Sequence, residues 1–213
     1  MDYPLIPNYL MSYLDSLVPA RPAEMQAMEE HAQKINFPII GPASGYFCYQ
    51  VARMIGARHI FELGSGYGYS TAWFAKAVSE NGGGEVFHVV WDEDLSRQAH
   101  QHLGALGYDG MIRYHVGEAV QTLRETAGPF DLIFNDINKD GYAASLPVIN
   151  EKLRPGGVLI VDNMLWSGRV FEAGDKSPET TSIRKLTELL THSPDWIVSL
   201  DPVRDGVVVA YKK

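Results

Sequence analysis

The sequence has a single cysteine, Cys48, so no disulfide can form within the chain. This favours a reducing compartment, and we interpret Cys48 as a small buried apolar residue. Basic residues are also few: lysine and arginine total 18 against 26 aspartate and glutamate, a net charge of −8, and the only tight basic cluster is the terminal pair Lys212 and Lys213. Because binding to a nucleic-acid backbone needs clustered positive charge, we expect no nucleic-acid partner.

The sequence also lacks the features that direct a chain to or across a membrane. No lysine or arginine precedes Arg21, whereas a secretory signal begins with a basic segment. The uncharged stretch 35–52 contains Pro38, Pro42 and two glycines, so it cannot be read as a spanning helix. We therefore expect a cytoplasmic protein with no membrane partner.

The chain of 213 residues shows no repeat, low-complexity tract or linker, which indicates a single domain. After about residue 57, short β-rich runs alternate with helical patterns, and this alternation predicts a parallel sheet built from βαβ units. The last two runs are separated only by residues 201–205, too few for a parallel crossover, so the last strand should be antiparallel. Strands are predicted at 59–63, 85–91, 112–116, 130–135, 157–162, 196–200 and 206–212. Helices are predicted near 8–17, 22–34, 44–56, 70–80, 95–105, 119–126, 143–153 and 179–191.

The first predicted strand ends in the glycine-rich stretch FELGSGYGYS, where Gly64, Gly66 and Gly68 let a ligand approach the backbone beside a helix start. A dinucleotide fingerprint needs its third glycine three positions after the second, but the spacing here is two and position 69 is Tyr. A phosphate-binding loop would need Lys after the last glycine. With Glu62 just ahead, the pattern favours a cationic, amine-bearing ligand such as S-adenosylmethionine.

The second predicted strand ends in Trp91 and Asp92. Trp91 offers a flat apolar surface for a purine, and Asp92 can accept hydrogen bonds from ribose hydroxyls. An equal alternative is that Asp92 only caps the following helix. After the third strand, Gly117 and Glu118 lie at the same edge of the sheet and give a weak indication of a ligand site.

Asp136, Asp162 and Asn163 follow the fourth and fifth predicted strands, which should be neighbours. Three oxygen ligands without sulfur or imidazole favour a hard divalent cation, Mg²⁺ first. The alternative is that these residues serve only as turns and caps. Lys139 can reach the same place as a base, although most lysines in loops are simply solvated. The predicted loop from 164 to 178 is a candidate functional loop.

From about residue 35 to the C-terminus, the sequence resembles the cation-dependent, S-adenosylmethionine-dependent O-methyltransferases, a family that includes the catechol and caffeoyl-coenzyme A enzymes. Five stretches carry the resemblance, in the same order as in the family: GPASGYF, GARHIFELGSGYGYS, FDLIFNDINKDGY, LRPGGVLIVDNMLWSGRV and PVRDGVVVA. The resemblance implies a Rossmann-like class I methyltransferase domain spanning 1–213, with N-terminal helices (1–57) that cap the site of a seven-stranded sheet core (58–213). It also implies a homodimer and a small phenolic or catecholic acceptor.

The resemblance also implies roles for individual residues. Ser70 is expected at the methionine carboxylate of the cofactor, Ile40 beside its methionine portion, and Lys139 as the catalytic base. Asp136, which is also expected to act in catalysis, Asp162 and Asn163 match the family's metal ligands. The expected cofactor-binding residues are Ile40, Glu62, Gly64, Gly66, Gly68, Tyr69, Ser70, Trp91, Asp92, Gly117, Glu118, Ala119 and Asp136.

Two positions depart from the family pattern. Val90 stands where the family has an acid that binds the cofactor ribose, and Asn138 replaces the second aspartate of the family's DADK-like string. They motivate an alternative function, a catalytically silent cofactor-binding protein on the same fold. The glycine spacing makes a nicotinamide oxidoreductase the weaker third hypothesis.

Overall fold

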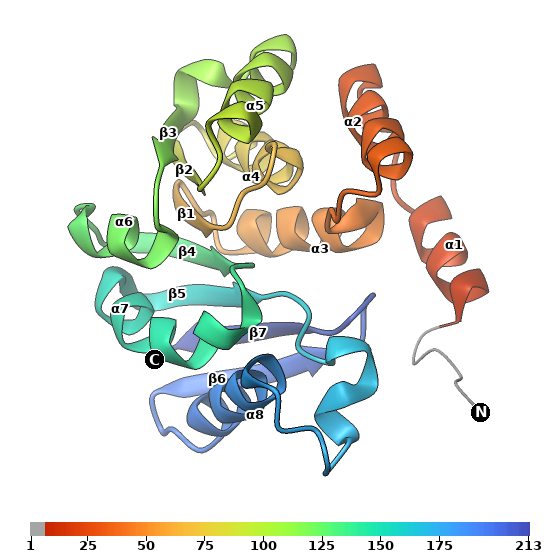
Figure 1. The fold of residues 1–213 in the computed structure, drawn as a ribbon. Helices are drawn as coiled ribbons and strands as arrows, with labels where there is room; N and C mark the ends of the chain where they lie inside the picture. Colours follow the sequence, from red (N-terminus) through yellow and green to blue (C-terminus); the bar gives the residue numbers. More distant parts are fainter. Residues whose placement is uncertain (1–6) are drawn as a thin grey trace.

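A seven-stranded sheet forms the centre of the protein in the computed structural model, which describes residues 7–213 (Figure 1). Its strand order is β3-β2-β1-β4-β5-β7-β6, with strands 1 and 4 side by side in the middle. The strands are β1 (His59–Leu63), β2 (Glu85–Val90), β3 (Ile112–Val116), β4 (Phe130–Asn135), β5 (Leu153–Val161), β6 (Trp196–Asp201) and β7 (Val207–Lys212).

All strand pairs from β3 to β5 are parallel, whereas β7 is antiparallel to both of its neighbours, β5 and β6. The predicted α/β fold with a reversed last strand is therefore confirmed. The turn 202–206 between β6 and β7 returns the chain to the sheet edge where β5 ends.

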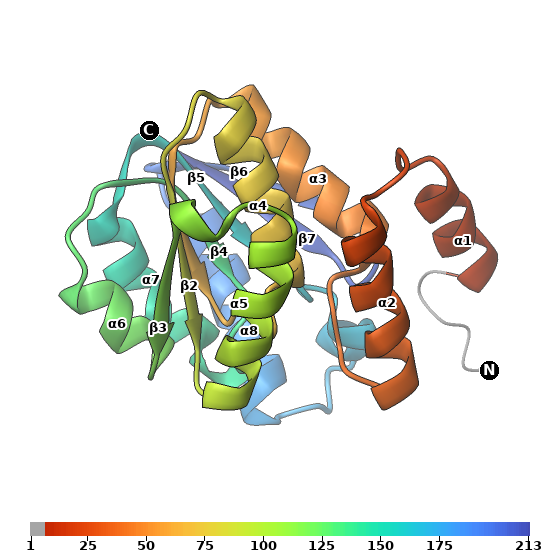
Figure 2. The same ribbon diagram turned by 90° about the horizontal axis from the view of Figure 1, so that it is seen from above.

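Helices cover both faces of the sheet (Figure 2). One face carries α2 to α5 and the other carries α6 to α8, while α1 lies at the outer side of α2 and α3 (Figures 1 and 2). The helices are α1 (Asn8–Ser16), α2 (Ala23–Ile35), α3 (Gly41–Met54), α4 (Tyr69–Glu80), α5 (Glu93–Ala105), α6 (Ala119–Glu125), α7 (Tyr142–Lys152) and α8 (Pro178–Thr191). Short 3-10 helices are η1 (Asp109–Met111), η2 (Lys139–Gly141) and η3 (Trp166–Phe171).

The sequence folds this way because the central strands bury side chains on both faces. Ile60 packs towards α3 and α4, whereas its neighbour Phe61 packs towards α6 and α7. Strands covered on both sides read as nearly continuous apolar runs, which is why they can be recognised in the sequence. Cys48 is a free thiol, 1% exposed in the first of these cores, as predicted.

Several predicted boundaries differ from the structure by one or two residues, and three differences are larger or change the kind of structure. Helix α3 begins at Gly41 rather than at 44, because Pro42 fits the first turn of a helix, where its missing N–H is not needed. Strand β5 begins at Leu153 rather than at 157, with a register irregularity opposite β4. The segment 164–178 was expected to be irregular, but it contains η3.

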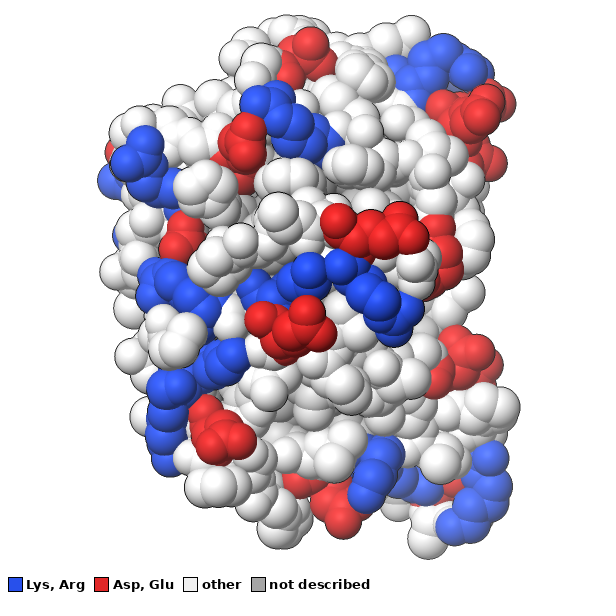
Figure 3. All heavy atoms as spheres, turned by 90° about the vertical axis from the view of Figure 1, so that its left-hand side faces the viewer, with Lys and Arg blue, Asp and Glu red and all other residues white. Residues whose placement is uncertain are grey.

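Charges of both signs mix on the face beside β3, α6 and α7 (Figure 3). Ion pairs link neighbouring elements, such as Arg113 with Glu85 on adjacent strands and Arg154 with Asp131 at 2.7 Å. Within residues 7–213, no helix is long and apolar enough to cross a membrane.

Candidate active site

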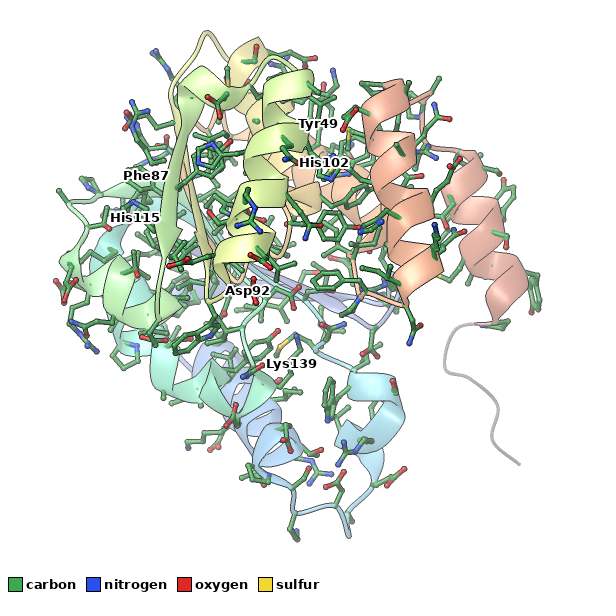
Figure 4. All side chains as sticks on the ribbon, turned by 45° about the horizontal axis from the view of Figure 1, so that its top comes forward. Tyr49, Phe87, Asp92, His102, His115 and Lys139 are labelled. Atoms are coloured by element: carbon green, nitrogen blue, oxygen red, sulfur yellow. The ribbon has the colours of Figure 1, made fainter. Side chains whose placement is uncertain are left out.

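A cleft of about 830 Å³ opens at the carboxyl ends of the parallel strands. The register explains its position: Leu63 pairs with Asn135, and Asn135 pairs with Val161, so the next residue of each strand lies at the same edge. Backbone N–H groups of Asp136 and Asp162 continue the ladder, donating to Leu63 and Asn135. Lining residues come from seven segments: Phe37, Pro38, Ile39, Gly64, Gly66, Trp91, Asp136, Ile137, Asn138, Lys139, Asp140, Asn163, Trp166, Glu179 and Arg204. Figure 4 shows Asp92 and Lys139 at this end of the sheet.

The glycine-rich turn after β1 forms one wall of the cleft. Gly64 has φ +88°, and a Cβ on it would lie 2.6 Å from the carbonyl oxygen of Asp136, so only glycine lets these two strand ends approach. A narrow extension of the cleft joins this turn to Ile40 and Ser70. The structure therefore brings together most of the predicted methionine-side residues.

Two further predicted residues, Gly68 and Tyr69, also contact neighbouring helices, and Tyr69 lines the narrow extension as well. Gly68 packs against α5: a Cβ there would meet Ala99 at 3.1 Å. Tyr69 is 2% exposed, and its hydroxyl donates to Glu29 of α2 at 2.7 Å. The Tyr69 side chain thus fixes α4 to the N-terminal helices, and its polar atom is directed at α2.

Glu62 is fully buried beneath the turn. Its Oε2 lies 2.5 Å from the Thr71 hydroxyl, which in turn lies 3.0 Å from Nδ1 of the buried His88. Burial raises the pKa of Glu62 to about 7 and lowers the pKa of His88 to about 3, because both charged forms lose their hydration. Thr71 and His88 were not predicted from the sequence; their only indication is that both are polar residues within apolar runs.

At the end of β2, the structure shows the capping role of Asp92. Its Oδ1 accepts from the backbone N–H of Asp94 at 2.7 Å and of Leu95 at 3.0 Å, at the start of α5. Trp91 is 68% exposed and lines both the main cleft and a neighbouring hollow of about 350 Å³. Val90 is 7% exposed and apolar, so it cannot accept a hydrogen bond through its side chain.

The turn after β3 lies beside that hollow. Gly117 donates to the carbonyl of Val90 at 3.0 Å, which joins the ends of β2 and β3. Glu118 lines the hollow, but both of its carboxylate oxygens cap α6, accepting from the backbone of Val120 and Gln121. Ala119 is buried in the first turn of α6. The resemblance predicts that this turn binds the adenine of the cofactor. Because the Glu118 carboxylate caps α6, the turn can offer the adenine backbone groups rather than a free carboxylate.

The two predicted metal-binding carboxylates each have a cationic partner. Lys139 Nζ donates to Asp136 Oδ1 at 2.6 Å, and Arg204 Nη1 donates to Asp162 Oδ2 at 3.2 Å. The other oxygen of Asp162, Oδ1, is buried without a hydrogen-bond partner. Asn163 has φ +58°, and its amide nitrogen lies 3.5 Å from Asp205 Oδ2.

These residues fit a divalent cation chemically. Burial and the nearby Asp136 raise the pKa of Asp162 to about 7, and burial raises the pKa of Asp136. A buried carboxylate with an unpartnered oxygen beside a second carboxylate is a site that positive charge would stabilise. Among residues 7–213, no group of three His, Cys, Asp or Glu side chains gathers in a metal-binding arrangement, and the predicted third ligand, Asn163, would contribute an amide oxygen.

Several lining residues were not predicted as site residues. Phe37 and Pro38 lie between the helices predicted at 22–34 and 44–56, and Trp166 belongs to the segment expected to be a functional loop. Arg204 lies inside the stretch PVRDGVVVA used for the resemblance, but only the fold shows that it reaches Asp162.

The fold and cleft define a class of α/β protein with a glycine-rich turn and an open cleft at the carboxyl ends of its parallel strands. Residues 20–213 match the model of the O-methyltransferase family. The chain is 29% identical to a catechol O-methyltransferase of Niastella koreensis, over 71% of this chain and 69% of that protein. It is 28% identical to a catechol O-methyltransferase of Mycobacterium tuberculosis, over 90% and 88%.

Among solved structures, an O-methyltransferase from Bacillus cereus in complex with S-adenosylhomocysteine has a TM-score of 0.87 at 25% identity, covering 96% of this chain and 97% of that one. The chain belongs to the O-methyltransferase family, and it is an S-adenosylmethionine-dependent O-methyltransferase. The family, the enzyme class and the S-adenosylmethionine part of the cofactor prediction are confirmed.

Proposed function

We propose that this enzyme transfers a methyl group from S-adenosylmethionine to a phenolic or catecholic hydroxyl, with a divalent cation bound at Asp136, Asp162 and Asn163. The observation that carries the proposal is the pair of carboxylates at the ends of β4 and β5, the part-exposed Asp136 and the buried Asp162, beside the glycine-rich turn and Lys139. The catechol O-methyltransferases among the relatives support the acceptor class.

On the cofactor side, we assign the methionine portion to the wall formed by Gly64, Ile40 and Ser70. The buried Glu62 beneath it would supply negative charge for the amine in its ionised form, which the positive charge of the bound cofactor favours. We assign the adenosine to the Trp91 side of the cleft, where the indole surface is exposed. This orientation directs the sulfonium methyl towards Asp136 and Lys139.

On the acceptor side, Trp166 and Phe37 provide flat apolar surfaces for an aromatic ring. A divalent cation, when bound, lowers the pKa of a coordinated hydroxyl, as it does for water. Lys139 Nζ donates to Asp136 Oδ1 at 2.6 Å as an ammonium, and a cation at Asp136 would compete with that ammonium. We assign the amine, once it has released a proton to solvent, to accept the proton of the acceptor hydroxyl. Fixing the oxygen and the methyl carbon in one cleft contributes by proximity.

The test is a methyl-transfer assay with catechol and S-adenosylmethionine, in Mg²⁺ and in excess chelator. We expect turnover only with the cation. Asp162→Asn should abolish metal-dependent turnover in a protein that still folds, whereas Asp195→Asn, at an exposed position, should behave like the parent. Undiminished activity in chelator would show that the metal assignment is wrong.

A catalytically silent cofactor-binding protein is the second candidate, favoured by Val90 and by the use of Asp92 as a helix cap. The same preparation distinguishes the two functions. S-adenosylmethionine binding in calorimetry without methylation of any phenol or catechol would favour the silent protein.

The homodimer implied by the family resemblance is also part of the proposal. Helix α1 presents Tyr9 and Tyr13, which are 78% and 60% exposed, and Leu17 just after the helix is 60% exposed. Such apolar surface favours a second copy. Light scattering coupled to gel filtration would measure the assembly.

A further inference from the structure

We propose that Arg204 binds a carboxylate on the methyl acceptor once a divalent cation has taken the place of its guanidinium at Asp162. The inference rests on the proposed function and names a subclass of its acceptor: aromatic acids with adjacent ring hydroxyls. Its starting point is that Arg204 and Lys139 are the two cationic side chains that line the cleft.

The backbone places Arg204 in the cleft at a conformational cost. Its φ is +55°, a left-handed conformation that favours glycine and is retained where the surrounding structure enforces it. The surrounding contacts are specific: Leu165 donates to the Asp205 carbonyl at 2.8 Å, and the Ser167 N–H donates to Asp205 Oδ1 at 2.6 Å. The turn 202–206 is thus fixed to the segment that precedes and begins η3, and Arg204 is fixed with it.

The guanidinium has donors to spare. Among residues 7–213, its one side-chain hydrogen bond is from Nη1 to Asp162 Oδ2 at 3.2 Å, whereas the group carries five N–H donors. The side chain is 31% exposed and also lines a second hollow of about 460 Å³, which shares Phe37 and Pro38 with the cleft. Arg204 therefore has space to leave Asp162 while it stays inside the site.

Charge explains why binding of the cation should release Arg204 from Asp162. The cleft and its floor hold four carboxylates and two cationic side chains. A divalent cation at Asp136 and Asp162 would balance these charges, and it would repel a guanidinium 3.2 Å from Asp162 Oδ2. A carboxylate on the acceptor then offers the displaced arginine a planar, bidentate partner. The carboxylates are Asp136, Asp140, Asp162 and Glu179, and the cationic side chains are Lys139 and Arg204.

Two acceptors that differ only in the carboxylate test the proposal: catechol and 3,4-dihydroxybenzoate. Calorimetry would measure the binding of each to the protein with S-adenosylhomocysteine and Mg²⁺ present. The parent should bind the acid about tenfold or more tightly, since a charge-assisted pair is among the stronger hydrogen-bonded contacts. Arg204→Gly, which suits the left-handed turn and should fold, should bring the ratio of the two affinities close to one. Arg204→Lys should leave an intermediate ratio, and Arg97→Ala, on the exposed surface of α5, should keep the parent ratio.

A second measurement addresses the exchange at Asp162. Mn²⁺ titration followed by electron paramagnetic resonance should show several-fold tighter binding in Arg204→Gly, because the competing guanidinium is gone. Equal Mn²⁺ affinity would overturn the exchange, and an acid-to-catechol ratio unchanged by Arg204→Gly would overturn the carboxylate site. Methyl transfer is assayed separately: if neither compound is methylated, the proposed function fails, while the binding ratios still decide the role of Arg204.

Discussion

Glu62 and His88 are paired in register on β1 and β2, and the hydroxyl of Thr71 lies within hydrogen-bond distance of both. One hydroxyl has a single proton, so it can donate to one of them and must accept from the other. When Glu62 is ionised, Thr71 donates to it, and the neutral His88 donates through Nδ1. The buried carboxylate beneath the cofactor turn is thus held by a neutral histidine through one intervening side chain.

The raised pKa of Glu62 predicts a pH-dependent stability. The folded protein holds a proton on Glu62 up to about pH 7, whereas the unfolded chain releases it near 4.5, so stability present below pH 4.5 is lost as the pH rises towards 7. Between pH 5 and pH 8 this effect lowers the free energy of unfolding by roughly 2 to 3 kcal/mol, and Glu62→Gln should abolish that decrease. Urea denaturation of both proteins at the two pH values measures it. Glu151→Gln, exposed at the end of α7, is the control; equal slopes in all three proteins would contradict the prediction.

His88 should act in the opposite direction. Its pKa is about 3 when folded and near 6.5 when unfolded, so the stability it contributes is complete above pH 6.5 and decreases as the pH falls. From pH 7 to pH 5 this effect lowers the free energy of unfolding by roughly 2 kcal/mol, and His88→Gln should abolish that decrease. His192→Gln, exposed at the end of α8, should retain the loss. If acid unfolding is the same with and without His88, the histidine is not buried in its neutral form.

Strand ends could be predicted because they depend on short-range patterns. Asp136 and Asp162 follow apolar runs that are buried on both faces, and neighbouring parallel strands bring such residues to one edge. Arg204 could not be assigned in this way: its contact with Asp162 spans 42 residues and depends on how the last turn packs on the segment 164–167. The direction of the Tyr69 side chain likewise depends on where α2 packs, which no local pattern contains.

Gly64 should not tolerate a side chain, because a Cβ would clash with the Asp136 carbonyl and not only because its φ is positive. Gly64→Ala forces a Cβ to 2.6 Å from the carbonyl oxygen of Asp136, which must separate β1 from β4 and disturb the cofactor turn. Gly107 has a similar φ of +79° but open space around it, so Gly107→Ala should cost only about 1 kcal/mol. Thermal unfolding and S-adenosylhomocysteine calorimetry should show a larger stability loss and at least tenfold weaker binding for Gly64→Ala alone. Similar behaviour of the two variants would mean that the close approach has no role.

Val90 stands where related enzymes would supply an acid for the cofactor ribose, and it is buried and apolar. Hydrogen bonds to a charged acceptor contribute about 1.5 to 3 kcal/mol each, so Val90→Glu should tighten S-adenosylmethionine binding roughly tenfold if the longer side chain reaches the ribose. The nearby Asp92 can replace the missing acid at the ribose only through Oδ2, because its Oδ1 caps α5. Asp92→Asn keeps an oxygen for the cap while it removes the charge, whereas Asp92→Ala removes both, at about 1 kcal/mol of stability. Calorimetry should therefore show weaker binding for both Asp92 variants if Asp92 binds the ribose, and for neither if it is only a cap. Unchanged affinity in Val90→Glu and in both Asp92 variants would place the ribose away from β2.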